Sequence, residues 1–375
     1  MRQHQIAAIP GDGIGPEVVR AGIEVLDATA RRSGNFRADV DWFDWGGEHY
    51  LEHGCMIPPN GLQAIARHDA ILFGSAGHPE IPDHITLWGL RLAICQSFDQ
   101  YANVRPARVL PGLNSPLRAR EATDIDWVIV RENSEGEYAG VGGRVHRDLA
   151  LETATDVSVL TRTGVERIMR FAFELASTRP RALLTVVTKS NAQRHAMVMW
   201  DQIASEVAAD HPAVEWDRML VDAMAARMVT DPTSIDTVVA TNLHADILSD
   251  LAAALTGSLG VAPTANIDPS RNRPSMFEPI HGSAFDIVGK GIANPIGTFL
   301  SVAMMLDHLG ETESAAQLRT AVEQITLDEN LHTPDLGGHA TTDSVTAAVV
   351  AAISEGAEPS QQPRSPGASP EARES

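Results

Sequence analysis

Short apolar runs, each followed by polar or glycine residues and then by a helix-like pattern, recur along most of this chain. The first run, QIAAIP, leads through the glycine turn GDGIGPEV into a helix with Pro16 and Glu17 in its first turn. Four similar runs follow: DAILFGS, DWVIVRE, ALLTVVTKS and TVVATNL. Buried strands that alternate with helices are typical of a largely parallel sheet covered by helices. The sequence therefore predicts an α/β fold with a large, mostly parallel sheet.

Chemically versatile side chains follow several of these predicted strands. Arg131, Glu132 and Tyr138 come after WVIV, Lys189 after TVVT, and Asp246 after VVAT. Ligands of open parallel sheets bind near the carboxyl ends of the strands. We therefore expect these residues to contribute to one functional region.

Composition excludes several classes of partner. The chain has 375 residues, 43% of them hydrophobic, which is enough for a large core. Its formal net charge of −20 argues against a nucleic-acid partner, because binding to phosphates needs a basic surface. Only Cys55 and Cys95 are present, too few for a disulfide framework. No signal peptide and no run of about 18 apolar residues is evident, so we expect a cytoplasmic protein without membrane association.

One acidic window raises a question of charge. Asp246 and Asp250 stand four residues apart in TNLHADILSD, and no Lys or Arg occurs between Arg227 and Arg271. On a helix these two carboxylates share a face and repel each other by roughly 0.2–0.5 kcal/mol. A solvated acidic surface is one interpretation, and a bound cation is the other. Asp222, within the mostly apolar stretch LVDAMAARMV, also needs a partner, for which a divalent ion is a candidate.

Lysine is almost absent from the chain. Only Lys189 and Lys290 occur among 29 basic residues. Lys189 directly follows a predicted buried strand, where partial desolvation can lower the pKa of an amine enough for proton transfer. A structural ion pair is the alternative. The later segment FEPIHGSAFDIVGKGIANP has neither helical nor strand periodicity and is typical of a long ordered loop that holds a ligand.

Six motifs, in this order, resemble those of one enzyme family: IPGDGIGPEV, NVRPARVLPG, VRENSEGEY, TKSN, TNLHADILSDL and FEPIHGSAFDIVGKGIANP. The family is that of the metal-dependent β-decarboxylating dehydrogenases, which includes isopropylmalate and isocitrate dehydrogenases. The resemblance extends from about Ile6 to Ile353. The segments PDHITLWG, FDQYANVRP and GGRV most resemble the branch that acts on D-malate and tartrate.

This resemblance implies a two-domain fold like that of isopropylmalate dehydrogenase, which is not a Rossmann fold. Residues 1–102 and 257–353 would form a discontinuous cofactor-binding domain, and residues 103–256 a domain for substrate, metal and dimerisation. The tail, residues 354–375, has no Val, Ile, Leu or aromatic residue, and we expect it to be disordered.

The resemblance also implies an activity: NAD-dependent and Mg²⁺- or Mn²⁺-dependent oxidation and decarboxylation of a small 2-hydroxy dicarboxylic acid. The metal ligands would be Asp246 and Asp250, with Asp222 supplied by the second subunit of a homodimer. Lys189, also supplied across the dimer, would accept the hydroxyl proton as general base. Tyr138 would protonate the enol carbon after carbon dioxide leaves. A K⁺ requirement is left open.

Further roles follow from the same resemblance. Arg105 and Arg131 would bind the substrate carboxylates through their planar guanidinium groups. The carboxylate of Asp286 would accept hydrogen bonds from the adenosine ribose and repel a 2′-phosphate, which favours NAD over NADP. Phe285 stands where relatives commonly have proline. The predicted cofactor-binding residues are His281, Gly282, Ser283, Ala284, Asp286 and Asn294.

At one position the chain departs from the family pattern. The residue ten positions before Arg105 is usually an arginine that binds substrate carboxylates, and here it is Cys95. Arg91 lies one helical turn before Cys95, so we predict that Arg91 takes over this contact. In the alternative, Arg91 points to solvent and the substrate carries less charge.

Two other functions are weighed against this one. Isopropylmalate dehydrogenase needs an apolar pocket, for which Leu87, Trp88 and Leu90 are candidates. A non-catalytic, cofactor-sensing partner subunit would have lost acid–base or metal residues, yet all of them are present in this chain.

Overall fold

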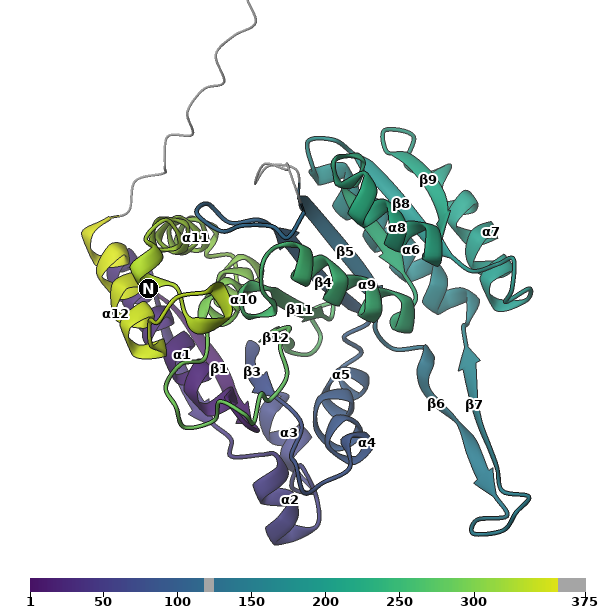
Figure 1. The fold of residues 1–375 in the computed structure, drawn as a ribbon, viewed down its shortest axis with the longest axis horizontal. Coiled ribbons are helices and arrows are strands. Elements are labelled where there is room, and N and C mark those ends of the chain that lie inside the picture. The colour runs from purple at the N-terminus through teal and green to yellow at the C-terminus, as the bar shows by residue number, and fades with distance from the viewer. Residues whose placement is uncertain (118–124, 357–375) are drawn as a thin grey trace, which may run out of the picture.

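The computed structural model describes residues 1–117 and 125–356 of the chain. Figure 1 shows a broad twisted sheet with helices packed on it and a two-stranded arm that projects from the body. The strands are β1 (Arg2–Gly11), β2 (Phe36–Trp42), β3 (Ala70–Ser75), β4 (Ala102–Arg108), β5 (Asp126–Glu132), β6 (Gly136–Val145), β7 (Thr153–Val159), β8 (Leu183–Thr188), β9 (Glu215–Leu220), β10 (Thr237–Ala240), β11 (Pro263–Ile267) and β12 (Ser275–Pro279).

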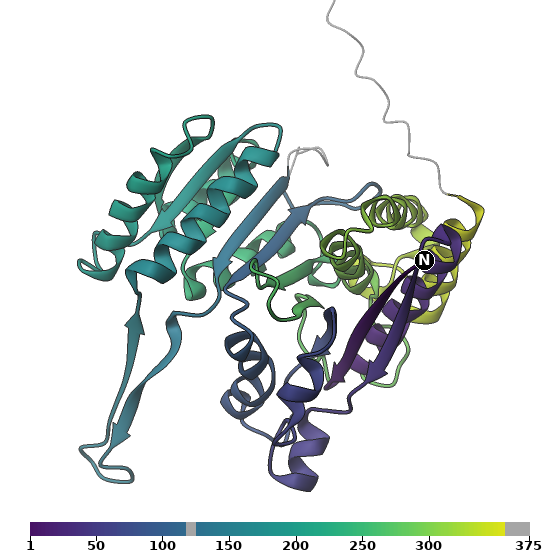
Figure 2. The same ribbon diagram turned by 180° about the vertical axis from the view of Figure 1, so that it is seen from behind.

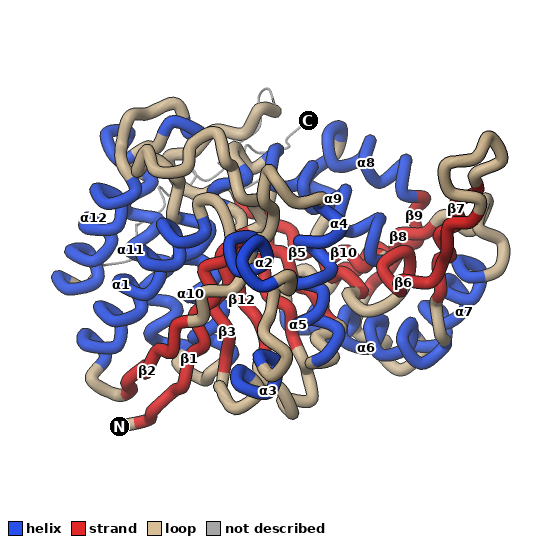
Figure 3. Tube along the Cα trace, turned by 90° about the horizontal axis from the view of Figure 1, so that it is seen from below, coloured by secondary structure: helices blue, strands red, loops and turns tan. Residues whose placement is uncertain are grey.

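Helices connect most of these strands. They are α1 (Gly15–Ser33), α2 (Gly47–His53), α3 (Gly61–Ile65), α4 (Asp83–Thr86), α5 (Leu92–Ser97), α6 (Arg162–Thr178), α7 (Ala196–Ala208), α8 (Val221–Thr230), α9 (Asn242–Leu255), α10 (Ile296–His308), α11 (Thr312–Thr326) and α12 (Thr342–Glu355). A π-helical turn, Leu87–Arg91, joins α4 to α5. In Figure 3, α1, α10, α11 and α12 gather beside β1 and β3, whereas α6, α7, α8 and α9 gather at the other end of the sheet.

Ten strands form one sheet in the order β2-β1-β3-β12-β11-β4-β5-β10-β8-β9. The strands on either side of the middle pair in parallel, which confirms the predicted fold class. The three pairings in the middle, β12 with β11, β11 with β4 and β4 with β5, are antiparallel. The two parallel groups therefore run in opposite directions.

The five apolar runs of the sequence all lie in strands of this sheet, β1, β3, β5, β8 and β10. Every residue of β3 and β10 is buried, because helices cover both faces of these strands. The strands of residues 1–102 and 257–353 lie on one side of the β11–β4 pairing, and the remaining strands lie on the other. This order agrees with the predicted discontinuous domain, whose boundaries remain a prediction.

The arm is the antiparallel hairpin β6–β7. Figures 1 and 2 show that it extends well away from the sheet. Apolar side chains are exposed along it, among them Val145, Leu149 and Leu151.

Helix α12 continues to Glu355, so the predicted tail begins later than residue 354. The rest of the predicted tail, residues 357–375, lies outside the described residues. Over the ranges that the structure covers, no helix is long and apolar enough to cross a membrane.

Candidate active site

A cavity of about 180 Å³ lies over the middle strands of the sheet. Its charged lining comes from elements far apart in sequence: the π-helical turn, β4, β5, α9 and β12. The charged side chains that line it are Arg91, Arg105, Arg131, Asp246, Asp250 and Glu278, and Tyr138 and His281 lie among them.

Strand register brings these groups together. Asn103 of β4 pairs with Arg131 of β5 on one side and with Asn266 of β11 on the other. Arg105 is two residues beyond Asn103, so its side chain lies on the same face of the sheet. We expected a site at the carboxyl ends of parallel strands. Arg131 does lie next to the carboxyl end of β5, but Arg105 lies in the middle of an antiparallel strand, because the cavity forms where the two oppositely directed groups meet.

Asp246 is neutralised by arginines that are remote in sequence. The Nη1 atom of Arg131 donates to Oδ1 of Asp246, and Nη2 of Arg105 lies 3.4 Å from the same oxygen. Burial by itself raises the pKa of Asp246, but the neighbouring Arg131 and Arg105 outweigh it and lower that pKa. Basic residues that are absent from this window in sequence are therefore close to Asp246 in space, and they supply countercharge that the sequence did not reveal. A bound cation at Asp246 and Asp250 stays a prediction.

Asp250 is less well compensated. It lies one turn after Asp246 on α9, as predicted, and its nearest cation is Nη1 of Arg105 at 3.9 Å. Burial and the neighbouring Asp246 raise the pKa of Asp250, although Arg105 opposes this shift. Two carboxylates side by side, one of them short of positive charge, fit a divalent cation.

The third predicted metal ligand is elsewhere. Asp222 lies in the first turn of α8, and its carboxylate accepts a hydrogen bond from Nζ of Lys189 at 2.5 Å. Neither residue lines the cavity. Within residues 1–117 and 125–356, no three His, Cys, Asp or Glu side chains are grouped so that they could hold a metal ion. The described chain thus brings Asp246 and Asp250 together and leaves Asp222 and Lys189 paired with each other.

Arg91 points into the molecule and not to solvent. It ends the π-helical turn, and its side chain is only 11% exposed. The Nε atom of Arg91 donates to Oε1 of Glu278 at 2.8 Å, and Nη2 donates to Oδ1 of Asn266 at 3.2 Å. Burial lowers the pKa of Arg91, but the charge of Glu278 more than offsets this, so the guanidinium stays protonated. Cys95 is buried and does not line the cavity, and burial raises the pKa of its thiol to about 11.

Tyr138 contacts the acidic side of the cavity. Its hydroxyl donates to Oδ2 of Asp246 at 3.3 Å, and the Arg131 guanidinium lies 5.2 Å from the centre of its ring. Gln96 of α5 donates to the backbone oxygen of Tyr138 at 2.9 Å and so ties the start of the arm to the body. Burial and the charge of Asp246 raise the pKa of the Tyr138 hydroxyl, which keeps its proton available.

Four of the six predicted cofactor residues, all in the loop after β12, line an adjoining cavity: His281, Ala284, Asp286 and Asn294. Gly282 lines the first cavity instead, and Ser283 lines neither. Two buried polar atoms of the same loop, Nε2 of His281 and Oγ of Ser283, have no hydrogen-bond partner in the part of the chain described. Unsatisfied buried polar atoms fit a polar ligand such as a dinucleotide. His281 also lines the first cavity, so the two cavities share a wall.

Several residues of the site were not predicted from sequence. Glu278 stands in the FEPIHG motif, and Asn103 and Asn266 lie in β4 and β11. Asp335 lines the cofactor cavity, where its carboxylate accepts hydrogen bonds from Ser258 and Asn294. Glu278 and Asn103 do stand within two of the six motifs, FEPIHGSAFDIVGKGIANP and NVRPARVLPG, whereas Asn266 had no sequence signal.

Comparisons with known proteins agree with this geometry. Residues 5–352 match the family model described as isocitrate/isopropylmalate dehydrogenase. A probable tartrate dehydrogenase/decarboxylase of Agrobacterium vitis is 65% identical over 94% of this chain and 98% of its own length. The D-malate dehydrogenase [decarboxylating] of Escherichia coli is 47% identical over 93% of this chain and 98% of its own length.

A solved structure of a related enzyme has the same fold. The crystal structure of isocitrate dehydrogenase from Methylococcus capsulatus superposes with a TM-score of 0.84 at 35% identity and covers 94% of this chain and 99% of that chain. The resemblance inferred from six motifs is confirmed. The chain belongs to the isocitrate/isopropylmalate dehydrogenase family of decarboxylating dehydrogenases.

Proposed function

We propose that this chain catalyses the NAD-dependent and divalent-metal-dependent oxidation and decarboxylation of a four-carbon 2-hydroxy dicarboxylate of the D-malate or tartrate type. The observation that carries the proposal is the convergence of Arg91, Arg105 and Arg131 on one cavity that has Asp246 and Asp250 at its edge. Arginine suits bidentate contact with carboxylates, and paired aspartates suit Mg²⁺ or Mn²⁺. The relatives named for tartrate and D-malate support this substrate class.

Charge balance supports a dicarboxylate together with a divalent ion. The described lining has three cationic side chains, Arg91, Arg105 and Arg131, and three anionic ones, which makes it neutral overall. His281 adds no charge, because burial lowers its pKa. A substrate with two negative charges and an ion with two positive charges would keep the cavity neutral, whereas either one alone would leave a buried charge uncompensated.

Each protein group has a defined task in the proposed reaction. The substrate hydroxyl would give its proton to Lys189 of a second subunit, and a bound nicotinamide would supply the acceptor for the hydride on C2. The bond between C3 and its carboxylate would then break, carbon dioxide would leave, and the electron pair of that bond would stay on the substrate as an enolate. Tyr138 donates the proton that completes the product at C3, for which its raised pKa is suited.

Asp246 and Asp250, with Asp222 of the second subunit, would hold the metal ion. When bound, the ion would supply Lewis acidity to the C2 oxygen and to the enolate. The loop from His281 to Asn294 would hold the dinucleotide, with Asp286 favouring NAD over NADP. A homodimer with shared sites is part of this proposal, because Lys189 and Asp222 do not line the cavity of their own chain.

The isopropylmalate alternative has less support. Of the three apolar candidates, Leu87 lines the cavity, whereas Trp88 lies next to Gly140 of the arm and Leu90 is fully buried in the core. Only one of the three predicted apolar residues therefore lines the cavity, beside Phe73, Pro279 and Ile280.

A substrate screen tests the proposal. NAD reduction and carbon dioxide release are measured with D-malate, the three tartrate isomers, 3-isopropylmalate and isocitrate, each with Mn²⁺, and with NADP in place of NAD as a cofactor control. We expect the highest kcat/KM with D-malate or a tartrate. Faster turnover of 3-isopropylmalate or isocitrate would overturn the proposed substrate class, and no turnover of any of them would overturn the proposed activity.

A further inference from the structure

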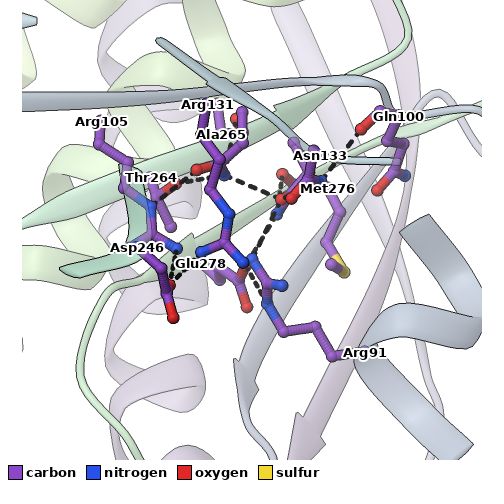
Figure 4. Close-up of polar contacts among 12 residues, drawn as sticks. Arg91, Gln100, Arg105, Arg131, Asn133, Asp246, Thr264, Ala265, Met276 and Glu278 are labelled. Carbon is purple, nitrogen blue, oxygen red and sulfur yellow. Dashed lines mark hydrogen bonds and ion pairs between the residues drawn. The ribbon is translucent and has the colours of Figure 1, made fainter. Parts of the chain in front are cut away.

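One buried amide connects two of the cavity's arginines. Asn266 of β11 is fully buried and does not line the cavity. Its Oδ1 atom accepts hydrogen bonds from Nη2 of Arg91 at 3.2 Å, Nδ2 of Asn103 at 2.9 Å and Nδ2 of Asn133 at 3.0 Å. Its own Nδ2 donates to Oε1 of Glu278 at 2.7 Å. Figure 4 shows the labelled side chains of Arg91, Arg131, Asn133 and Glu278 close together.

The hydrogen bonds of this network reach an arginine on each side. On one side, Glu278 accepts from Nε of Arg91 at 2.8 Å. On the other side, Oδ1 of Asn103 accepts from Nε of Arg105 at 2.7 Å. In both arginines Nε, the atom nearest the side-chain stem, is held by the network, so each guanidinium is fixed in direction as well as position. The third arginine, Arg131, is held separately by Asn242 and Asp246.

The network costs more to bury than an apolar cluster of the same size, since every amide and charge in it must be satisfied. Stability alone therefore does not account for it. What it provides is a fixed separation between two buried cations, whose side chains are only 11% and 7% exposed. Two guanidinium groups at a fixed separation bind best a ligand whose two carboxylates lie at the matching distance.

We infer that Asn266 is a positioning residue that sets the spacing between Arg91 and Arg105 and thereby selects the chain length of the dicarboxylate. Asn266 acts through the arginines and does not touch the substrate. Glu278 holds the guanidinium of Arg91 and so helps to fix the same spacing. The inference rests on the proposed function, because it assumes that both arginines bind carboxylates of one ligand.

Unreactive dicarboxylates test the inference by binding alone. Isothermal titration calorimetry with the Mn²⁺-loaded protein gives the affinities for malonate, succinate and glutarate, which differ in length by one methylene each. We expect the parent protein to prefer one length by about tenfold, the usual discrimination for one methylene. In Asn266→Leu, which removes the amide but keeps its approximate volume, this preference should fall to less than about threefold. The KM for the reactive substrate should rise more than kcat falls.

Asn133→Leu is the matched control. Asn133 is as deeply buried and also donates to Oδ1 of Asn266, but its other hydrogen bond goes to the backbone oxygen of Gln100 and not to an arginine. This variant should lose stability and keep the length preference. If Asn266→Leu does not fold, Glu278→Gln serves in its place, since an amide can still accept from Arg91 while the fixing charge is lost. It should weaken the length preference as well.

The outcomes distinguish failure of the proposed function from failure of the positioning role of Asn266. A parent protein that binds none of the three dicarboxylates would overturn the proposed function. A parent that discriminates, with a folded Asn266→Leu or Glu278→Gln variant that keeps the same ratio, would overturn the positioning role alone. Equal loss of the length preference in Asn133→Leu would also overturn it, because the effect would then come from general loosening of the core.

Discussion

At the scale of single residues, the site depends on arginines whose partners fix them in place. Arg91 is the clearest case, because it lines the cavity, whereas Cys95, at the position where the family resemblance implies an arginine, does not. Its ion pair with Glu278 leaves part of the guanidinium facing the cavity. The sequence predicted that Arg91 could reach the site, and the structure places it there.

Replacing Arg91 by Ala should raise KM for the dicarboxylate at least about tenfold, since a charge-assisted contact is typically worth ~1.5–3 kcal/mol. Arg91→Lys should recover little, because a lysine cannot make the same bidentate contact. Steady-state kinetics measures the effect, and Arg67→Ala, which removes an exposed ion pair with Asp41, is the control. An unchanged KM in Arg91→Ala would show that the substrate does not use this arginine.

If Arg91 takes over the contact of the missing arginine, the sequence alone predicts that Cys95→Arg is tolerated. The structure changes this expectation, because Cys95 is buried and the positive charges of Arg91 and Arg131 are close enough to affect its thiol. A third cation there should lower the melting temperature. The double variant Arg91→Leu/Cys95→Arg should melt at a higher temperature than Cys95→Arg, because one of the competing charges is gone.

Asp286 should set the choice of nucleotide. It lines the cofactor cavity and has no ion pair among the described residues, so its charge is available to repel a 2′-phosphate. Asp286→Ala should narrow the kcat/KM preference for NAD over NADP by about fivefold or more. It should not reverse the preference, because Asp335 lines the same cavity. Glu24→Ala, an exposed change on α1, controls for the loss of one negative charge. If the ratio of kcat/KM with NAD to kcat/KM with NADP is the same in both variants, the discrimination does not depend on Asp286.

At the scale of elements, helix α9 combines two tasks on one face. Asp246 neutralises the buried arginines Arg131 and Arg105, whereas Asp250 is more exposed and is weakly paired. The two aspartates, one turn apart, therefore differ in what they contribute to the fold, although they are predicted to bind the same ion.

Their amide variants should separate these tasks. Asp246→Asn and Asp250→Asn should each raise the Kd for Mn²⁺ at least about tenfold, since each removes a carboxylate ligand. Only Asp246→Asn should also lower the free energy of unfolding, by roughly 2 kcal/mol, because it leaves buried arginines without their countercharge. Calorimetric Mn²⁺ titration and urea unfolding measure the two effects. Removal of the metal with a chelator should abolish NAD reduction, and a chelated enzyme with full activity would refute the metal assignment.

The elements also show what the sequence could predict and what it could not. Apolar runs located five strands, and the four-residue spacing of Asp246 and Asp250 placed them on one face of α9, because both signals are local. The partners of Asp246 were missed. They depend on the antiparallel register of β4 and β5, which no local pattern encodes. Asn266 was missed for the same reason, since it has a function only through neighbours on other strands.

At the scale of the whole molecule, the described chain holds an incomplete set of the predicted catalytic groups. Tyr138 and the predicted metal ligands Asp246 and Asp250 line the cavity, but Lys189 and Asp222 lie elsewhere and neutralise each other. The projecting arm gives a second indication. A two-stranded hairpin is marginally stable by itself in water, and this one exposes Val145 and Leu151. Both features are expected of a chain that completes its sites by pairing with a second copy.

Complementation between two inactive variants tests this arrangement. Lys189→Met should block hydride transfer, whereas Tyr138→Phe should slow protonation after decarboxylation, and single-turnover kinetics should separate the two steps. If Lys189 serves the site of the other subunit, a mixed dimer of the two variants has one site with both lesions and one intact site. Two-fold symmetry then predicts about half of the parental activity for the purified mixed dimer. If each site uses its own Lys189 and Tyr138, both sites carry a lesion and mixing restores nothing. The two variant homodimers, unmixed and passed through the same exchange procedure, set the background.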